Sequence, residues 1–231
     1  MNLDLQTITY AAFGGIVPAL FWLWFWLRQD KKRPEPRGLI FLSFVAGMIA
    51  VPLVIPLQRL ITTDFVNISF ITVLLWATFE EIFKYTGSYF AALKRRAMDE
   101  PIDPMIYLIT TALGFAALEN TLFLINSISG SGFLENIITG NMRFIGATLL
   151  HTLSSGVIGF SMALTFYKSR YAKRLSLIIG IILAIALHTF FNFFIMNTSG
   201  NSIFWIFASV WALVVVLILF FEKVKRIKKF K

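Results

Sequence analysis

The sequence predicts an all-α, polytopic transmembrane helical bundle of about seven spans, with the N-terminus outside the cell and the C-terminus in the cytoplasm. Of the 231 residues, 58% are hydrophobic, and the mean hydropathy is +0.77. A soluble domain of this length has too little interior to hide so many apolar side chains, whereas lipid tolerates them. Charged residues make up only 14% of the chain and lie mostly between long apolar segments, which indicates a membrane protein.

Seven apolar segments are long enough to cross a bilayer, which takes about 20 residues per helix. They lie at roughly 8–27, 38–57, 66–92, 105–127, 142–167, 175–197 and 202–221. The first is unlike a secretory signal because it lacks a basic N-terminal region and a small-residue cleavage site. The Ser/Gly-rich stretch from Ser127 to Gly132 is expected to open an outer loop that runs to Gly140, with a short surface helix at 132–138.

The basic residues alternate between the connecting segments, and this alternation predicts the orientation. All but three of the 21 Lys and Arg residues lie between spans one and two, three and four, or five and six, or in the C-terminal tail. Connecting segments rich in Lys and Arg stay in the cytoplasm, which gives the orientation above. The same distribution explains the net charge of +9 without a nucleic-acid partner, and the basic tail is expected to attract anionic lipid headgroups.

Ionisable side chains inside predicted spans are the strongest functional signal. At the bilayer centre each costs about 2.5–3.5 kcal/mol on insertion scales, so such residues usually serve a purpose. The set comprises Glu80, Glu81 and Lys84 in the third span, Glu119 in the fourth, His151 in the fifth and His188 in the sixth. At a rise of about 1.5 Å per residue, all of them lie between the membrane midplane and the outer leaflet. Four consecutive helices are therefore expected to bring these groups into one cavity.

Local spacing refines this expectation. Glu80 and Lys84 are four residues apart in the order that favours an ion pair, which would leave Glu81 as the freer carboxylate. His188 and Asn192 are also four residues apart and share a helix face. Glycine, alanine and serine around the sites in the fourth and fifth spans are expected to let the helices approach closely.

This set of side chains suits peptide-bond hydrolysis by either of two routes. Glu119, His151 and His188 can hold Zn²⁺, with Glu81 as general base or fourth partner. Alternatively, a desolvated glutamate can activate water without a metal, with a histidine orienting that water. Asn192 can donate to the oxyanion or hold the second ring nitrogen of a ligand histidine. Because the chain has no cysteine, a thiol nucleophile and thiolate ligands are excluded.

At these residues the sequence resembles the PrsW family of intramembrane proteases, which belongs to a wider superfamily with the type II CAAX prenyl endopeptidases. The matching motifs are Glu80-Glu81-Ile-Phe-Lys84, then Pro101-Ile-Asp103 with Tyr107, then Gly114-Phe-Ala-Ala-Leu-Glu119-Asn120, and finally Arg143, His151 and His188-x-x-x-Asn192. They cover about half of the chain. One departure is Pro104, where the family usually has glycine. Another is Glu119, where the wider superfamily often has histidine, and this leaves the role of Glu119 open.

The resemblance implies a multi-pass protease of the bacterial plasma membrane. The whole chain, residues 1–231, would form one protease domain with a catalytic core at 66–197. Its partner would be a single-pass membrane protein such as an anti-sigma factor, cut on the outer side in a site-1 cleavage. By this likeness Glu80, Glu81 and His188 would be the most critical residues.

Two other functions fit a membrane bundle with buried charges. A proton-coupled transporter also carries Glu, Lys and His in mid-membrane, but it usually shows repeated halves or broken helices, which this sequence lacks. A non-catalytic membrane scaffold is the second alternative. Such a scaffold does not need Glu81 together with both histidines, so their joint presence favours an enzyme.

Overall fold

The computed structural model of the chain describes residues 5–31, 33–62, 68–128, 133–198 and 202–228, with the side chains of 127–128, 133–145 and 202 outside this description. Within these residues it is all-helical. The long α-helices are α1 (Leu5–Leu27), α2 (Arg37–Ile61), α3 (Phe70–Ser88), α4 (Asp103–Ile128), α5 (Phe133–Leu164), α6 (Arg170–Asn197) and α7 (Ser202–Val224). A short 3₁₀ helix, η1 (Arg28–Asp30), follows α1, and a π-helical turn, η2 (Tyr89–Leu93), continues α3.

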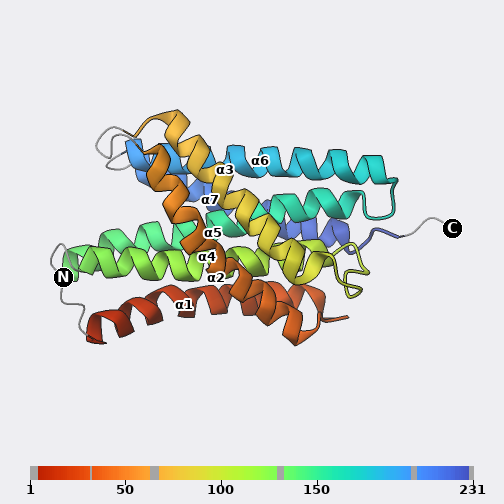
Figure 1. Cartoon of the computed structure of the whole chain (residues 1–231), viewed down its shortest axis with the longest axis horizontal. Coiled ribbons are helices and arrows are strands. Elements are labelled where there is room, and N and C mark those ends of the chain that lie inside the picture. Colours follow the sequence, from red (N-terminus) through yellow and green to blue (C-terminus); the bar gives the residue numbers. More distant parts are fainter. Residues whose placement is uncertain (1–4, 32, 63–67, 129–132, 199–201, 229–231) are drawn as a thin grey trace.

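Consecutive helices run in alternate directions along the length of the bundle (Figure 1). In the described part of the chain, six helices are long and apolar enough to cross a membrane. The remaining long helix, α3, has the length but carries Glu80, Glu81 and Lys84. The predicted polytopic helical bundle is therefore confirmed, and α3 is the helix that brings charge into its interior.

The connection between α4 and α5 is shorter than the outer loop that the sequence predicted. α4 continues to Ile128 and α5 already begins at Phe133, so the expected surface helix forms the first turns of α5. Extending an existing helix needs no new nucleus, which favours one long helix over two short ones. Residues 129–132, where the Ser/Gly-rich stretch lies, are outside the described residues, as is the side chain of Arg143.

α4 occupies the centre of the bundle. Every residue from 101 to 117 is buried, and the helix contacts α1, α2, α3 and α5. A helix that is covered on all sides has no polar face to show, and the sequence of α4 is accordingly apolar all round. The charged and imidazole side chains described below are arranged around the C-terminal half of this central helix.

Glycine allows α4 to touch the backbones of its neighbours. A Cβ on Gly159 of α5 would lie 2.6 Å from the Cα of Met105 in α4. A Cβ on Gly114 of α4 would overlap the carbonyl of Phe44, and one on Gly47 of α2 would overlap the carbonyl of Thr111. The close helix approach that the small residues predicted is therefore confirmed.

Replacing Gly47 with alanine should lower the stability of the bundle by about 1–3 kcal/mol, because the new methyl group meets the α4 backbone rather than a side chain that can move. Gly38 is the matched control: it lies in the same helix, and a Cβ there meets nothing within 4 Å. The comparison is made on thermal midpoints in one detergent. Equal midpoints for the Gly47→Ala and Gly38→Ala variants would contradict the close crossing of α2 and α4.

The basic segments gather at one end of the bundle, which we call the basic end. It is the end at which α1, η2, α5 and α7 finish and α2, α4 and α6 begin (Figure 1). The alternation seen in the sequence thus corresponds to a real separation of charge along the bundle. The cytoplasmic placement of the basic end stays a prediction from the positive-inside rule.

At the basic end the connection between α1 and α2 is tied to the start of α4. The carboxylate of Glu35 accepts a hydrogen bond from the Tyr107 hydroxyl. Asp103, the first residue of α4, accepts the backbone N–H groups of Asp99 and Glu100 at 2.7 and 2.6 Å. These bonds fix the turn that leads into α4, so this part of the resemblance motif has a structural role here.

Glu35 should make stability depend on pH. Burial raises the pKa of Glu35 to about 8; the hydrogen bond from Tyr107 opposes this and the neighbouring Asp103 adds to it. Since an ordinary glutamate titrates near 4.5, the folded chain binds more protons than the unfolded chain between these values. The stabilisation is therefore complete below about pH 4.5 and is lost as the pH rises towards 8. A Glu35→Gln variant, compared with the native chain by thermal midpoint, should gain stability relative to it between about pH 5 and 8.5, and parallel profiles would show that Glu35 titrates normally.

Candidate active site

Four helices bring the predicted site residues together. α3 supplies Glu80 and Glu81, α4 supplies Glu119, α5 supplies His151 and α6 supplies His188. The two imidazole rings meet edge to face, with centroids 5.1 Å apart. All of these side chains are buried except that of Glu119, which is 39% exposed. The predicted convergence of these side chains is confirmed by this geometry, and their catalytic roles stay a prediction.

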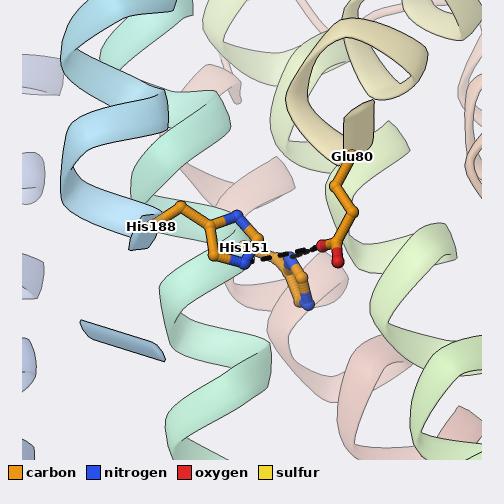
Figure 2. A group of neighbouring side chains, drawn as sticks. All are labelled: Glu80, His151 and His188. Atoms are coloured by element: carbon orange, nitrogen blue, oxygen red, sulfur yellow. Dashed lines mark ion pairs between the residues drawn. The ribbon is translucent and has the colours of Figure 1, made fainter. Parts of the chain in front are cut away.

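The centre of the site is formed by Glu80 and the two histidines. Glu80 Oε2 lies 3.5 Å from His188 Nε2 and 3.9 Å from His151 Nδ1, and the three atoms lie within 4.8 Å of one another. Figure 2 shows the carboxylate of Glu80 directed at both rings from the opposite side of the site. Among the described residues, Glu80 Oε2 has no hydrogen-bond partner although it is buried. It is therefore free to accept a ligand or a water.

On each histidine, the ring nitrogen that faces away from Glu80 is hydrogen-bonded to another carboxylate. Glu119 Oε2 lies 2.7 Å from His151 Nε2, and Glu81 Oε1 lies 2.7 Å from His188 Nδ1. An ionised carboxylate can only accept, so these ring nitrogens carry the protons. The nitrogens that face Glu80 are then left with their lone pairs. Fixing the tautomer by a carboxylate in this way is typical of metal-binding histidines.

The arrangement favours a ligand set different from the predicted one. Glu119 was expected to bind metal together with His151 and His188, but it lies on the outer side of the His151 ring, and Glu80 takes the position between the histidines. Counting residues from the helix ends gave the level of Glu119 and His188 along the bundle correctly. The rotation of α3 about its axis, which decides whether Glu80 or Glu81 faces the histidines, is set by packing against the other helices.

The predicted ion pair of Glu80 with Lys84 is wrong. Lys84 Nζ lies 2.6 Å from Glu81 Oε1, three residues away on α3, and 3.0 Å from His151 Nδ1. Its ammonium also lies 5.1 Å from the centre of the Phe115 ring, and the side chain is fully buried. Glu80 does not reach this ammonium because its side chain extends towards the histidines. Glu81 is consequently not the freer carboxylate.

Gln58 of α2 is a site residue that sequence reasoning missed. Its Nε2 donates a 2.8 Å hydrogen bond to Glu80 Oε1. This bond holds one oxygen of Glu80 and leaves Oε2 to face the histidines. The predicted second span ended at residue 57, so Gln58 was placed outside the membrane. Its position in α2, which continues to Ile61, shows it to be a polar side chain within a spanning helix.

A small cavity of about 80 Å³ adjoins the histidines. Glu119, Asn120 and Asn192 line it together with His151 and His188, so it has room for a few water molecules beside the site. The Asn120 amide donates to Thr148 Oγ1 at 3.0 Å and thereby joins α4 to α5. Asn192 lies one turn beyond His188, half-buried at the cavity wall, where the sequence placed it.

The central residues fit a divalent metal. Two histidines and one glutamate form a donor set of catalytic zinc sites, whose ligands at about 2.0–2.2 Å from the ion lie about 3.3–3.6 Å apart. The separation of Glu80 Oε2 from His188 Nε2 is within this range, and that from His151 Nδ1 is slightly wider. Metal binding at His151 Nδ1 would require Lys84 to release that nitrogen while keeping its bond to Glu81.

The charge balance favours the same conclusion. When ionised, the site contains three carboxylates, those of Glu80, Glu81 and Glu119, against the single ammonium of Lys84. Buried charge without compensation is costly. A divalent cation beside Glu80 would neutralise the two remaining negative charges.

The chain was compared with known proteins. The family model described as PrsW family intramembrane metalloprotease matches residues 35–220, from the connection before α2 to the last turns of α7. Protease PrsW of Oceanobacillus iheyensis is 27% identical over 192 residues, which cover 81% of this chain and 83% of that protein. Protease PrsW of Shouchella clausii is 26% identical over 219 residues, which cover 94% and 96% respectively.

A third relative, Protease PrsW of Bacillus subtilis, is 23% identical over 194 residues, which cover 83% of this chain and 85% of that protein. No solved structure matches the chain. The bacterial relatives, together with the six candidate spans, place the chain in the bacterial plasma membrane as a multi-pass protein. Because the family match extends over most of the chain and includes every residue of the site, the chain belongs to the PrsW family of intramembrane metalloproteases.

Proposed function

We propose that this protease hydrolyses a peptide bond in or next to a transmembrane segment of a single-pass membrane protein, at the site formed by Glu80, His151 and His188. The observation that carries the proposal is the unpartnered oxygen of Glu80 between two histidines whose outer nitrogens are both held by carboxylates. Glu81 Oε2 is also unpartnered, but Glu80 Oε2 is the one that lies beside the inward nitrogens of both histidines.

Zinc is the metal that this donor set suits best. Glu80 Oε2, His151 Nδ1 and His188 Nε2 would hold it, and a zinc ion at such a site polarises a carbonyl and makes a bound water acidic at neutral pH. Glu81 and Glu119 keep the two rings oriented. Lys84 balances the charge of Glu81, and Gln58 keeps Glu80 pointing inwards.

Proton transfer is best assigned to Glu119. It lines the cavity, its side chain is partly exposed, and only its Oε2 is held by His151. A carboxylate in this position can take a proton from the attacking water and return it to the leaving amine. Asn192, which lines the same cavity, can donate its amide N–H to the oxyanion that develops on the carbonyl oxygen.

A metal-free route has one observation in its favour. Lys84 Nζ lies 3.0 Å from His151 Nδ1 and can donate a hydrogen bond to its lone pair. A metal would need the same nitrogen. In this route Glu80 itself would be the general base, and the histidines would orient the water. Metal content distinguishes the two routes, as argued in the Discussion.

The substrate is proposed to be a single-pass anti-sigma factor that is cut on the outer side of the membrane. The position of the site supports an outer cut. Glu119 is nine residues from the end of α4, and His188 is nine residues from the end of α6, about 14 Å in each case, at the end of the bundle opposite the basic end. If the basic end is cytoplasmic, the site lies in the outer half of the membrane.

The test is cleavage of purified candidate substrates by the purified protein in liposomes. Mass spectrometry of the products should locate the new termini near the outer end of the substrate's transmembrane segment. Products cut at the cytoplasmic end would contradict the outer site. The absence of cleavage of any single-pass protein, with proton-driven uptake into the same liposomes, would instead favour the transporter.

A further inference from the structure

A second cavity, unrelated to the site, lies at the basic end between η2, the end of α5 and the start of α6. Its volume is about 320 Å³. Lys94 and Arg95 line it from the η2 side, and Lys173 and Arg174 line it from α6. The floor is apolar and includes Leu93, Met98, Met162 and Leu177. We refer to this cavity as the basic pocket.

The four cations of the basic pocket have no carboxylate partner. No Asp or Glu lines the pocket, and within the described residues none of the four forms an ion pair. Lys94 Nζ instead lies 4.3 Å from the centre of the Phe90 ring, and Lys173 Nζ lies 5.4 Å from that of Phe166. Arg95 donates two long hydrogen bonds to backbone carbonyls, to Ala91 at 3.4 Å and to Phe90 at 3.5 Å. All four residues are exposed, so water and salt screen their mutual repulsion, and an anion in the pocket would pair with charges that the described protein leaves unpaired.

The other large cavity at the basic end shows the contrast. It has a volume of about 490 Å³ and is lined by four cations, among them Arg33 and Lys225, but also by Asp30, Asp99 and Glu100. Arg33 pairs with Glu100 and Asp99, and Lys225 pairs with Glu222. The charges of that cavity are therefore largely satisfied within the protein, and those of the basic pocket are not.

The basic pocket opens beside surfaces that face lipid. The last turn of the α3–η2 helix and the first turns of α6 line it, so it lies at the membrane boundary. Next to it, Phe90 is 57% exposed, and on α6 Ile178 and Ile182 are 55% and 59% exposed. An anion bound in the pocket would thus have apolar helix surface directly beside it, on the membrane side.

We propose that the basic pocket binds the phosphate headgroup of an anionic phospholipid, whose acyl chains lie against the exposed apolar face of α6. Arg95 and Arg174 offer planar forks that suit phosphate oxygens, and Lys94 and Lys173 add charge. A soluble anion would satisfy the four cations but would leave the adjoining apolar face unused. This site is distinct from the basic C-terminal tail, because it is a built cavity between helices.

Lipid bound here would also stabilise the enzyme. The helices that line the pocket are the ones that carry Glu80 and Glu81, His151 and His188. A ligand that binds the folded chain alone raises its stability with concentration. The bundle is therefore expected to unfold at a higher temperature in membranes that contain anionic lipid.

The experiment measures lipid retained by the purified full chain in native mass spectrometry, after exchange with an equimolar mixture of phosphatidylglycerol and phosphatidylcholine. The native chain should retain phosphatidylglycerol preferentially. The Arg95→Gln/Arg174→Gln variant should lose about 10- to 30-fold in apparent affinity for it, as expected for two basic residues near a charged headgroup. The Arg96→Gln/Arg170→Gln variant is the matched control. It removes the same charge from equally exposed residues at the same end that do not line the pocket, and its apparent affinity should change by less than about twofold because these residues are screened from the bound headgroup.

A second measurement needs no variant. The thermal midpoint of the native chain should rise with phosphatidylglycerol and not with phosphatidylcholine. Equal loss of lipid in both double variants, or an equal midpoint in both lipids, would overturn the proposal. A midpoint that rises as much with millimolar inorganic phosphate as with phosphatidylglycerol would also overturn it, since the pocket would then be a site for free anions.

Discussion

Replacing Glu80 with glutamine should reduce peptide-bond cleavage by at least about 10³-fold while the protein remains folded. The substitution keeps the size of the side chain and leaves an oxygen that can accept the Gln58 hydrogen bond. It removes the negative charge that faces His151 and His188. That charge is needed whether Glu80 binds a metal or serves as general base, and loss of a general base alone typically costs 10²–10⁴-fold. Single-turnover cleavage of a membrane-embedded substrate in liposomes provides the measurement.

The matched control is Glu222→Gln in α7. Glu222 lies in the last turn of α7, at the basic end, and pairs with the exposed Lys225. Its loss should leave the cleavage rate within about twofold, as expected for a surface ion pair. Thermal midpoints of both variants show whether the fold is retained. A Glu80→Gln protein that cleaves at the native rate would remove Glu80 from the chemistry and, with it, the central role of this cluster.

The sequence predicted the level of Glu119 and His188 along the bundle, because α4 and α6 end within one residue of the predicted spans. The corresponding count for His151 was wrong, because α5 begins at Phe133, well before the predicted span at 142. Glu119 and His188 both lie nine residues from the same end of the bundle. Side chains at the same level on neighbouring helices can meet, which is why a common cavity was expected. Helix spacing of 1.5 Å per residue carries this information without knowledge of the fold. The convergence of acids and histidines from four helices could therefore be foreseen.

The roles within the site could not be foreseen to the same degree. Glu80 and Glu81 differ by about 100° around α3, and no property of the sequence alone decides which of them faces the histidines. The rotation of α3 is fixed by its contacts with α2, α4 and α6. Lys84 can reach a carboxylate three or four residues away on α3. The rotation of α3 turns Glu80 towards the histidines, so Lys84 pairs with Glu81. Gln58 was missed for a different reason: its helix continues beyond the predicted boundary, and boundaries are the least certain part of such a prediction.

Removing the metal should abolish cleavage. The affinity of the chain for the metal should depend more on Glu80 than on Glu119. Chain purified without added zinc is expected to hold about one divalent ion, which prolonged dialysis against a chelator removes together with activity, and added zinc should restore both. The ion compensates the excess of negative charge between three carboxylates and Lys84. Apo protein should accordingly be less stable than loaded protein, by an amount that increases with the zinc concentration. This stability change is a readout that does not rely on catalysis.

The decisive comparison is between two glutamates that contact the same histidine. Glu80 Oε2 faces the ligand nitrogen of His151, whereas Glu119 Oε2 accepts from its outer nitrogen. Glu80→Gln should leave no zinc measurable by elemental analysis, because it removes one of three ligands. Glu119→Gln should keep a weakened site, with affinity lower by about 10–100-fold, as is typical when the residue behind a ligand histidine is lost. Equal loss of zinc in both variants would indicate that Glu119 is itself a zinc ligand, as the sequence predicted. Full cleavage by protein shown to be free of metal would instead mean that Lys84 stays on His151 Nδ1 during turnover and that Glu80 activates the water by itself.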